Sequence, residues 1–464
     1  MAPHVIIVGG GLAGLAAGAA LAVRGLRVTI LESRPRWGGR ASSIVDSETG
    51  ETIDNCQHVS MGCCTNFDHF CRTVGIDHLL QTQTGLNFVA PNNAICRFAA
   101  SPWPAPFHLL PAFRRLSYLS RDDLTQIRKG LWGLSRERQF DGRVSFAEWL
   151  AQHGQSPQVQ ERFWRVVLVS ALSESLDRID VSHARKVFVD GFLANRAGWK
   201  VRIPTVPLDE LYGAKLTEWF AERPAALRLK TGVERIVLEK GRVEAVELRN
   251  AERIAGDHVI LAVPYHVLPR LLPEPLARDP FFNGAMQLES APISSVHLWY
   301  DRPITELPHA VFVERTSQWL FNRSAIHSNN VADGHYYQVV ISASREVAAM
   351  GQDETVGKVR RELCDVWPAA KRAELRHSRL ITEHKAVFSP VPGVDELRPG
   401  QQTPVANLQL AGDWTATGWP ATMEGAVRGG YLAAENVLRH LGRNEPVLRP
   451  DLPTAFLSKL LLRL

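Results

Sequence analysis

The chain has 464 residues, of which 45% are hydrophobic and 22% charged, and this composition excludes a mainly disordered protein. Its net charge of +5 is small for this length and no nucleic-acid-binding module is apparent, so we expect no nucleic-acid partner. A chain of this length is expected to form two closely packed domains.

Residues 5–32 have the pattern of one β-α-β unit. An apolar run of strand length at 5–8 is followed by three spaced glycines, a helical pattern and a second strand, RVTILE. In such a unit Gly9 permits the tight turn, Gly11 lets the backbone approach a pyrophosphate, and Gly14 allows the helix to pack closely. The pattern therefore predicts a dinucleotide-binding domain.

The two ends of this unit indicate which dinucleotide binds. The helix N-terminus, at Leu12 and Ala13, is expected to supply N–H groups to the phosphates. Glu32, followed by Ser33, ends the second strand where a carboxylate can accept a hydrogen bond from a ribose 2′-OH. An acid there disfavours a 2′-phosphate, so FAD or NAD is predicted rather than NADP.

The stretch 5–23 carries no charge and also has the hydropathy of a membrane span or signal peptide. Its five glycines fit a strand-turn-helix better, and the preceding MAPH has no Lys or Arg. We therefore expect a cytoplasmic protein, with contact to the inner face of the cell membrane left open. The six cysteines include no Cys-x-x-Cys pair, which predicts reduced thiols and no metal site.

Two further segments resemble a known superfamily. RPRWGGRAS at 34–42 places a glycine pair and an arginine directly after the acid. LQLAGDWTATGWPATMEGAVRGGYLAAENVL at 408–438 indicates a strand, a Gly-Asp turn, a loop, and a helix beginning near Thr422 or Met423. They resemble the second glycine motif and the C-terminal flavin signature of the FAD-dependent amine oxidase and phytoene desaturase superfamily.

This resemblance implies a Rossmann-like α/β FAD-binding domain with a discontinuous α+β substrate domain. It implies that Asp413 meets the ribityl-phosphate region and that a backbone group near Val233 faces the adenine. The FAD is expected to be non-covalent, because no cysteine follows Cys364 to form a C-terminal linkage. The other implied cofactor contacts are Gly38, Gly39, Arg40, Gly412, Thr422, Met423 and Gly425.

The domains are predicted to alternate along the chain. The FAD-binding domain is expected to combine residues 1–90, 205–275 and 385–442. The substrate domain then comprises 91–204 and 276–384, and a tail follows at 443–464.

Residues 101–138 become helical after a Pro-rich start and interleave aromatic with basic residues. They predict either an amphipathic surface on an anionic membrane or ordinary core helices with solvated arginines. The leucine-rich end, 453–464, which contains Lys459 and Arg463, is a second candidate for membrane contact but is too short to span a bilayer. In the membrane interpretation the inserted residues are Trp103, Phe107, Phe113 and Trp132, and those facing headgroups are Arg114, Arg115, Arg128 and Lys129.

The segment DNCQH, at 54–58, narrows the resemblance. With SVHLWYDRP and AGDWTATGWPATMEGAVR it is similar to the hydroxysqualene dehydroxylases, also called squalene-associated FAD-dependent desaturases, although Cys56 replaces a usual glycine. The resemblance implies reductive removal of the hydroxyl of hydroxysqualene to give squalene, a step toward hopanoids or related C30 isoprenoids. It implies hydride delivery from flavin N5, a hydrophobic C30 substrate and an external electron donor.

The chemistry of this reaction suggests roles for the polar residues. Hydroxide is a poor leaving group, so we predict that His58 protonates it and that Gln57 or Asn55 orients the hydroxyl or a water. The alternative is that Asp54 and Asn55 cap a turn and His58 is a satisfied buried histidine. The aromatic residues of ERFWRVVLVSALSESL and VHLWY are expected either to line an apolar tunnel or to form core.

Three other functions compete with this one. A carotenoid or polyprenoid desaturase or isomerase would share the cofactor, the tunnel and the membrane contact. An amine oxidase is disfavoured, because Ser295 and Thr422 occupy positions where such oxidases usually have a lysine and a tyrosine. A non-catalytic prenyl-lipid-binding protein, similar to the Rab GDP-dissociation inhibitors, would not need an intact FAD motif.

Overall fold

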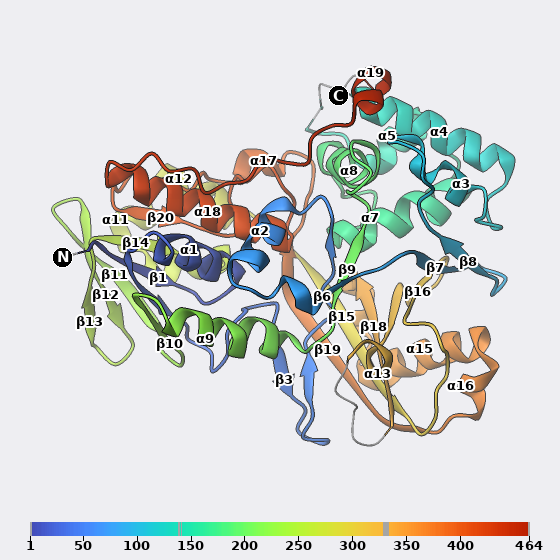
Figure 1. Cartoon of the computed structure of the whole chain (residues 1–464), viewed down its shortest axis with the longest axis horizontal. Coiled ribbons are helices and arrows are strands. Elements are labelled where there is room, and N and C mark those ends of the chain that lie inside the picture. The colour runs from blue at the N-terminus through green and yellow to red at the C-terminus, as the bar shows by residue number, and fades with distance from the viewer. Residues whose placement is uncertain (1, 138–139, 141, 328–333, 463–464) are drawn as a thin grey trace.

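A five-stranded parallel sheet organises one half of the computed structural model, which describes residues 2–137, 140, 142–327 and 334–462 (Figure 1). The order is β10-β2-β1-β14-β20. Its strands are β1 (His4–Val8), β2 (Arg27–Leu31), β10 (Ala225–Arg228), β14 (His258–Leu261) and β20 (Leu408–Leu410). β1 and β14 have no exposed residue, as expected for central strands of a parallel sheet.

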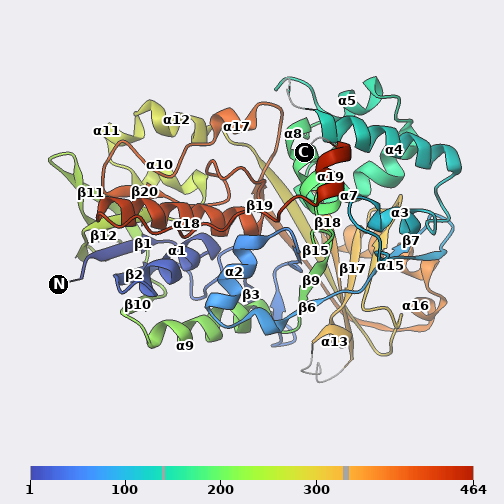
Figure 2. The same cartoon turned by 45° about the horizontal axis from the view of Figure 1, so that its top comes forward.

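Two helices, α1 (Leu12–Ala22) and α18 (Met423–His440), lie side by side against this sheet (Figures 1 and 2). Every residue of α1 is buried. The helices approach closely because α18 has a glycine at the contact: a methyl group on Gly430 would lie 2.2 Å from the carbonyl oxygen of Ala13. The start of α18 at Met423, after its cap Thr422, agrees with the sequence-based prediction.

The parallel sheet takes strands from three distant parts of the chain, each within one of the segments predicted to form the FAD-binding domain. The predicted segment boundaries do not coincide with every element. β7 (Leu86–Val89) belongs to the other large sheet, and β19 (Leu375–Phe388) crosses the boundary at 384. The exact limits of the domains therefore stay a prediction.

A seven-stranded sheet organises the second half, in the order β19-β15-β18-β17-β16-β7-β8. Its other strands are β8 (Ile95–Phe98), β15 (Ser290–Tyr300), β16 (His309–Phe312), β17 (Trp319–Asn322) and β18 (His335–Ser342). One side packs in a core with α15 (Gln352–Val366), for example Leu298 with Leu363. The helices of residues 110–193 share a second core with Leu86, Phe321 and Val340 of the same sheet.

Those helices begin at well-formed caps. Ser120 and Asp123 form a capping box at α4 (Arg121–Arg136), and Ser145 and Glu148 form another at α5 (Phe146–Gln152). The rest of this layer includes α3 (Leu110–Phe113), α6 (Pro157–Val159), α7 (Arg165–Leu172) and α8 (Val181–Phe188).

The aromatic residues of ERFWRVVLVSALSESL and VHLWY, which were expected either to line a tunnel or to form core, lie in cores. Trp164 is fully buried among Phe146, Phe163 and Phe188. Trp299 stacks on Tyr336, with 4.6 Å between ring centroids. The walls of a substrate site must therefore come from other residues.

The remaining strands and helices are short. The strands are β3 (Ser43–Val45), β4 (Thr52–Asp54), β5 (Ser60–Met61), β6 (Leu80–Thr82), β9 (Val201–Pro204), β11 (Val233–Glu239), β12 (Arg242–Leu248) and β13 (Arg253–Ala255). The helices are α2 (Thr65–Thr73), α9 (Lys215–Ala221), α10 (Leu268–Leu271), α11 (Glu274–Ala277), α12 (Pro280–Met286), α13 (Arg323–Ile326), α14 (Arg345–Ala349), α16 (Pro368–Arg372), α17 (Val394–Leu397) and α19 (Phe456–Leu462). Within the described part of the chain, no helix combines the length and hydropathy needed to cross a bilayer.

Candidate active site

A cavity of about 440 Å³ opens where the parallel strands end and extends to the seven-stranded sheet. Its lining includes the residues that follow β1, β2, β14 and β20, which is where open α/β sheets bind ligands. The predicted site residues that line it are Gly9, Gly11, Leu12, Ala13, Glu32, Ser33, Gly38, Gly39, Arg40, Asn55, Gln57, His58, Val233, Gly412, Asp413, Thr422 and Met423.

The three glycines of the first turn have different physical requirements. Gly9 has φ +113°, and a methyl group on it would lie 2.4 Å from the carbonyl oxygen of Ala262. A methyl on Gly14 would lie 2.0 Å from the carbonyl oxygen of Gly9, so this glycine lets α1 pack closely against the turn. Gly14 is not part of the cavity lining. Gly11 faces open space, with Gly39 Cα the nearest atom at 3.9 Å. That space is what a close-approaching phosphate requires.

Glu32 is positioned by the same turn. One carboxylate oxygen accepts the N–H of Gly10 at 2.8 Å, and the other accepts the N–H of Arg34 at 2.8 Å. The side chain is buried at the end of β2, yet it lines the cavity beside Ser33. A fixed acceptor at this point fits a ribose hydroxyl.

The N-terminus of α18 closes the opposite side of the cavity. The Thr422 hydroxyl accepts the N–H of Gly425 at 3.1 Å, so both residues shape the helix start, and Thr422 and Met423 line the cavity while Gly425 does not. Asp413 accepts a hydrogen bond from Arg40 at 2.7 Å, which holds the glycine-pair loop against the turn after β20. Two helix N-termini thus face one cavity, and their positive ends favour an anionic cofactor.

This arrangement defines a dinucleotide-binding oxidoreductase fold, and comparison with known proteins agrees. Residues 12–438 match the model of the family described as flavin containing amine oxidoreductase. The chain belongs to that family, and its cofactor is FAD.

The relatives span nearly the whole chain. The 15-cis-phytoene desaturase of Solanum lycopersicum is 26% identical over 94% of this chain and 78% of its own length. A probable zeta-carotene desaturase of Synechococcus elongatus is 27% identical over 94% of this chain and 98% of its own. An oxidoreductase from Methanosarcina mazei has a similar fold, with a TM-score of 0.71 at 16% identity, over 94% of this chain and 100% of that chain.

The segment DNCQH is fixed by a buried ion pair that sequence analysis did not find. Asp54, at the end of β4, pairs with Arg323 of α13, and their side chains are 0% and 1% exposed. The other carboxylate oxygen accepts the Ser43 hydroxyl at 2.7 Å and the Leu208 N–H at 2.8 Å. The guanidinium also donates to the side-chain carbonyl of Gln57. Asp54 and Arg323 therefore determine where the following polar residues lie.

Both predicted orienting amides have internal partners. Asn55 donates to the carbonyl of Arg40 and accepts the Cys56 N–H at 2.9 Å. Gln57 donates to the carbonyl of His58 at 2.9 Å. The two amides fix the backbone around His58, and their proposed contact with a substrate hydroxyl stays a prediction.

His58 lines the cavity as a neutral ring. Its Nδ1 lies 2.9 Å from the Cys56 carbonyl, which can only accept, so Nδ1 carries the proton. Burial lowers the pKa of His58 below 6.5; Arg40 and Arg323 lower it further, and Asp54 and the Cys56 carbonyl only partly oppose this. Its Nε2 has no hydrogen-bond partner among the described residues and is available to a bound molecule. Burial also raises the pKa of the Cys56 thiol to about 12, so that thiol stays protonated.

One part of the cavity lining is mostly apolar, but it contains two unpartnered hydroxyls. Ala171, Ile293 and Val340 belong to this part together with Ser173 and Ser342. Neither serine hydroxyl has a hydrogen-bond partner among the described residues, and neither is sealed from the cavity. Ser173 is 4% exposed and has a left-handed backbone, at φ 56° and ψ 33°. Non-glycine residues held in this conformation are uncommon and concentrate at functional sites.

The described cavity lining contains neither lysine nor tyrosine. Ser295 accepts a hydrogen bond from Gln338 at 2.7 Å, and it is Ile293 of the same strand that lines the cavity. Thr422 is engaged as the cap of α18. The described lining therefore contains no residue of the two types, lysine and tyrosine, that amine oxidases usually have at these positions.

Arg323, Ser173 and Ser342 are among the site residues that sequence analysis missed. Asp54 ends β4 (Thr52–Asp54) with its side chain buried, and a buried carboxylate requires a counter-charge. Its identity had no local signal, because 269 positions separate the partners. The serines belong to no motif, and left-handed backbone at Ser173 is not predictable from its type.

The glycine turn yields a matched pair of variants. Gly11→Ala is expected to fold normally, since φ is −76° and the methyl meets no protein atom closer than 3.9 Å. It should weaken FAD binding about tenfold or more, because overpacking costs about 1–3 kcal/mol. Gly9→Ala should instead impair folding. Apo-protein unfolding and FAD titration measure both effects, and normal FAD affinity in Gly11→Ala would show that the cradle is misassigned.

The ion pair gives a second prediction. Arg323→Met leaves the carboxylate of Asp54 buried and unpaired, so the free energy of unfolding should fall by about 3–5 kcal/mol. Adding Asp54→Asn removes that charge and should recover part of the loss. Urea unfolding of the apo proteins measures both, and a loss below about 1 kcal/mol in Arg323→Met would contradict the assigned role.

Proposed function

We propose that this flavoprotein removes the hydroxyl of hydroxysqualene to give squalene. When reduced FAD is bound it supplies a hydride, which replaces the C–O bond with a C–H bond. The departing hydroxyl takes a proton and leaves as water, and the oxidised flavin must be re-reduced by an external electron donor. The protein residues then have to bind a long apolar chain, place its hydroxyl and supply the proton.

The observation that carries the proposal is the unequal lining of the cavity. The DNCQH segment gives one polar wall, and Ala171, Ile293 and Val340 give an apolar one. An apolar wall binds an isoprenoid through burial, at about 0.8 kcal/mol per methylene group. The polar groups of the lining, in the DNCQH segment and at Ser173 and Ser342, would then select where along that chain the reaction occurs.

His58 is the proposed proton donor. Its ring is neutral at pH 7, so donation requires prior protonation at Nε2. The lowered pKa makes the protonated His58 ring a stronger acid, but it also reduces the fraction of enzyme in which that ring is protonated. The reductive reaction should therefore speed up as the pH falls through the lowered pKa of His58.

A carotenoid-type desaturase is the second candidate. The names of the relatives, a phytoene desaturase and a zeta-carotene desaturase, favour it. A neutral His58 whose Nε2 can accept a proton also suits it. In that reaction oxidised FAD would supply the hydride acceptor and His58 would take a proton, so the rate should rise with pH through the same pKa.

The direction of the reaction is testable in one single-turnover experiment. The enzyme is photoreduced without oxygen and mixed with hydroxysqualene, and flavin reoxidation is compared with squalene formed. Equimolar amounts are expected. If the flavin stays reduced, while oxidised enzyme introduces a double bond into a polyprenoid, the desaturase is the correct assignment.

The pH dependence separates the two roles of His58. In the wild type the single-turnover rate should increase as the pH is lowered below 6.5, and His58→Gln should lose this dependence and be about 100-fold slower. FAD content serves as the control. A variant that keeps the wild-type rate and pH profile would exclude His58 as the acid.

The two free serine hydroxyls are proposed to bind the substrate hydroxyl. Ser342→Ala and Ser173→Ala should each weaken binding of hydroxysqualene to the oxidised holoenzyme about fivefold, the loss of one hydrogen bond, without changing squalene binding. Ser170→Ala is the matched control, because its hydroxyl already contacts the Val166 carbonyl and Trp319. Equal losses for alcohol and hydrocarbon would contradict the assignment.

A further inference from the structure

Three separate segments expose large apolar side chains at one end of the molecule, where Figures 1 and 2 place α3, α4 and α19 together. α19 contributes Phe456 and Leu460, which are 78% and 63% exposed. We call this surface the α3/α4/α19 face. Its exposed apolar residues are Trp103, Phe107, Leu110, Trp132, Phe456 and Leu460.

Hydrogen bonds show that these segments are neighbours. Arg136 of α4 donates to the carbonyl of Leu461 at 3.2 Å, and its guanidinium stacks on Trp132 at 3.9 Å. On the other side, Arg196 donates to the carbonyl of Ser101 at 3.1 Å, close to Trp103. The neighbouring Asn195 donates to the carbonyl of Pro453, just before α19, at 2.8 Å. The segments that carry the six apolar side chains are therefore neighbours.

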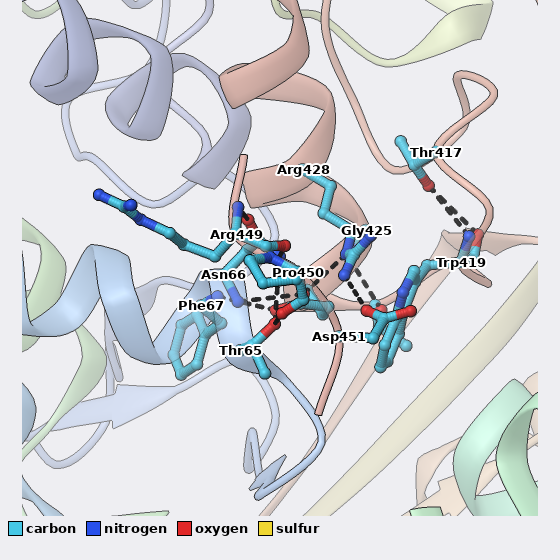
Figure 3. A network of polar contacts seen from close by, with 12 residues as sticks. Thr65, Asn66, Phe67, Thr417, Trp419, Gly425, Arg428, Arg449, Pro450 and Asp451 are labelled. Carbon is cyan, nitrogen blue, oxygen red and sulfur yellow. Dashed lines mark hydrogen bonds and ion pairs between the residues drawn. The ribbon is translucent and has the colours of Figure 1, made fainter. Parts of the chain in front are cut away.

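The tail that carries α19 is fixed to the FAD-binding half. Figure 3 shows Thr65 donating to the carbonyl of Pro450, at 2.9 Å, and Arg428 of α18 paired with Asp451. Asn66 of α2 accepts the N–H of Arg449 at 2.7 Å in the same network. Further along, Ser458 donates to the carbonyl of Leu193 at 2.7 Å. These contacts fix the position of α19, and the side chains of Phe456 and Leu460 stay exposed.

The charges on this face have one predominant sign. Along α4, Arg121, Arg128 and Trp132 recur at helical spacing on one face, with Lys129 adjacent. In the described residues of 101–137 and 453–462, the exposed charged side chains are six basic ones and one acidic one. They are Arg114, Arg115, Arg121, Arg128, Lys129, Lys459 and Asp122.

We propose that the α3/α4/α19 face binds the surface of an anionic lipid bilayer. The aromatic and leucine side chains would enter the interface while the surrounding Arg and Lys side chains meet the headgroups. A protein partner fits less well, because charged residues are depleted at the core of protein interfaces, while on this face six exposed cations accompany the apolar side chains. In this proposal residues 101–138 form part of the membrane-binding surface, except that Phe113 packs against the core. Arg463 lies outside the described residues.

This surface also has a consequence for supply of the substrate. A C30 alcohol is insoluble in water and resides in membranes, so a docked enzyme would take it from the bilayer. That consequence rests on the proposed function, whereas the docking itself does not.

The test uses the full-length holoenzyme and sedimentation with vesicles. Vesicles of phosphatidylcholine containing about one third phosphatidylglycerol should carry down the protein, and vesicles of phosphatidylcholine alone should carry down much less. Phe456→Ser with Leu460→Ser should reduce binding to the anionic vesicles about tenfold. Arg128→Glu with Lys129→Glu should reduce it at least as much and remove most of its salt dependence.

The matched controls change exposed residues elsewhere. Val45→Ser with Met286→Ser, and Lys240→Glu, should bind vesicles like the wild type. All variants alter exposed side chains, and unchanged FAD content confirms their folding. The proposal is overturned if the face variants bind like the wild type, or if they only convert a dimer to a monomer in gel filtration. A protein that binds vesicles but leaves hydroxysqualene unreacted would contradict the proposed function alone.

Discussion

The close approach of backbone to a dinucleotide is the constraint on which the rest of the structure depends. The turn after β1 must pass the carbonyl of Ala262 and leave space at Gly11, and only glycines meet both conditions. α18 must in turn lie against α1, which requires Gly430 at the contact. Once these segments meet, the ends of the parallel strands and two helix N-termini surround one cavity.

The substrate end follows from a different constraint, the burial of charge. Asp54 lies between the FAD-binding turn and the seven-stranded sheet. Arg323 belongs to α13, the helix that joins β17 to β18 of that sheet. Because a buried carboxylate without a partner is costly, the pair fixes the position of the second half relative to the first. The same pair fixes the segment that carries His58, so cofactor and polar wall are positioned together.

The sequence was most informative where function fixes local spacing. The β-α-β unit, Glu32, the glycine pair and the start of α18 were all predicted, because a bound dinucleotide dictates residue type at short separation. The partner of Asp54 was not, because the contact is between residues distant in sequence. Aromatic runs such as the one containing Trp164 could not be assigned, because hydropathy does not distinguish a core from a tunnel wall.

We predict that the oxygen of the substrate leaves the molecule as water. Hydroxysqualene labelled with ¹⁸O in its hydroxyl would be mixed, without oxygen, with enzyme whose flavin has been reduced, and the label would be followed by mass spectrometry. We expect one labelled water for each flavin oxidised, together with squalene free of oxygen. A product that retains the label, or water that never acquires it, would contradict the assignment of this site to reductive dehydroxylation.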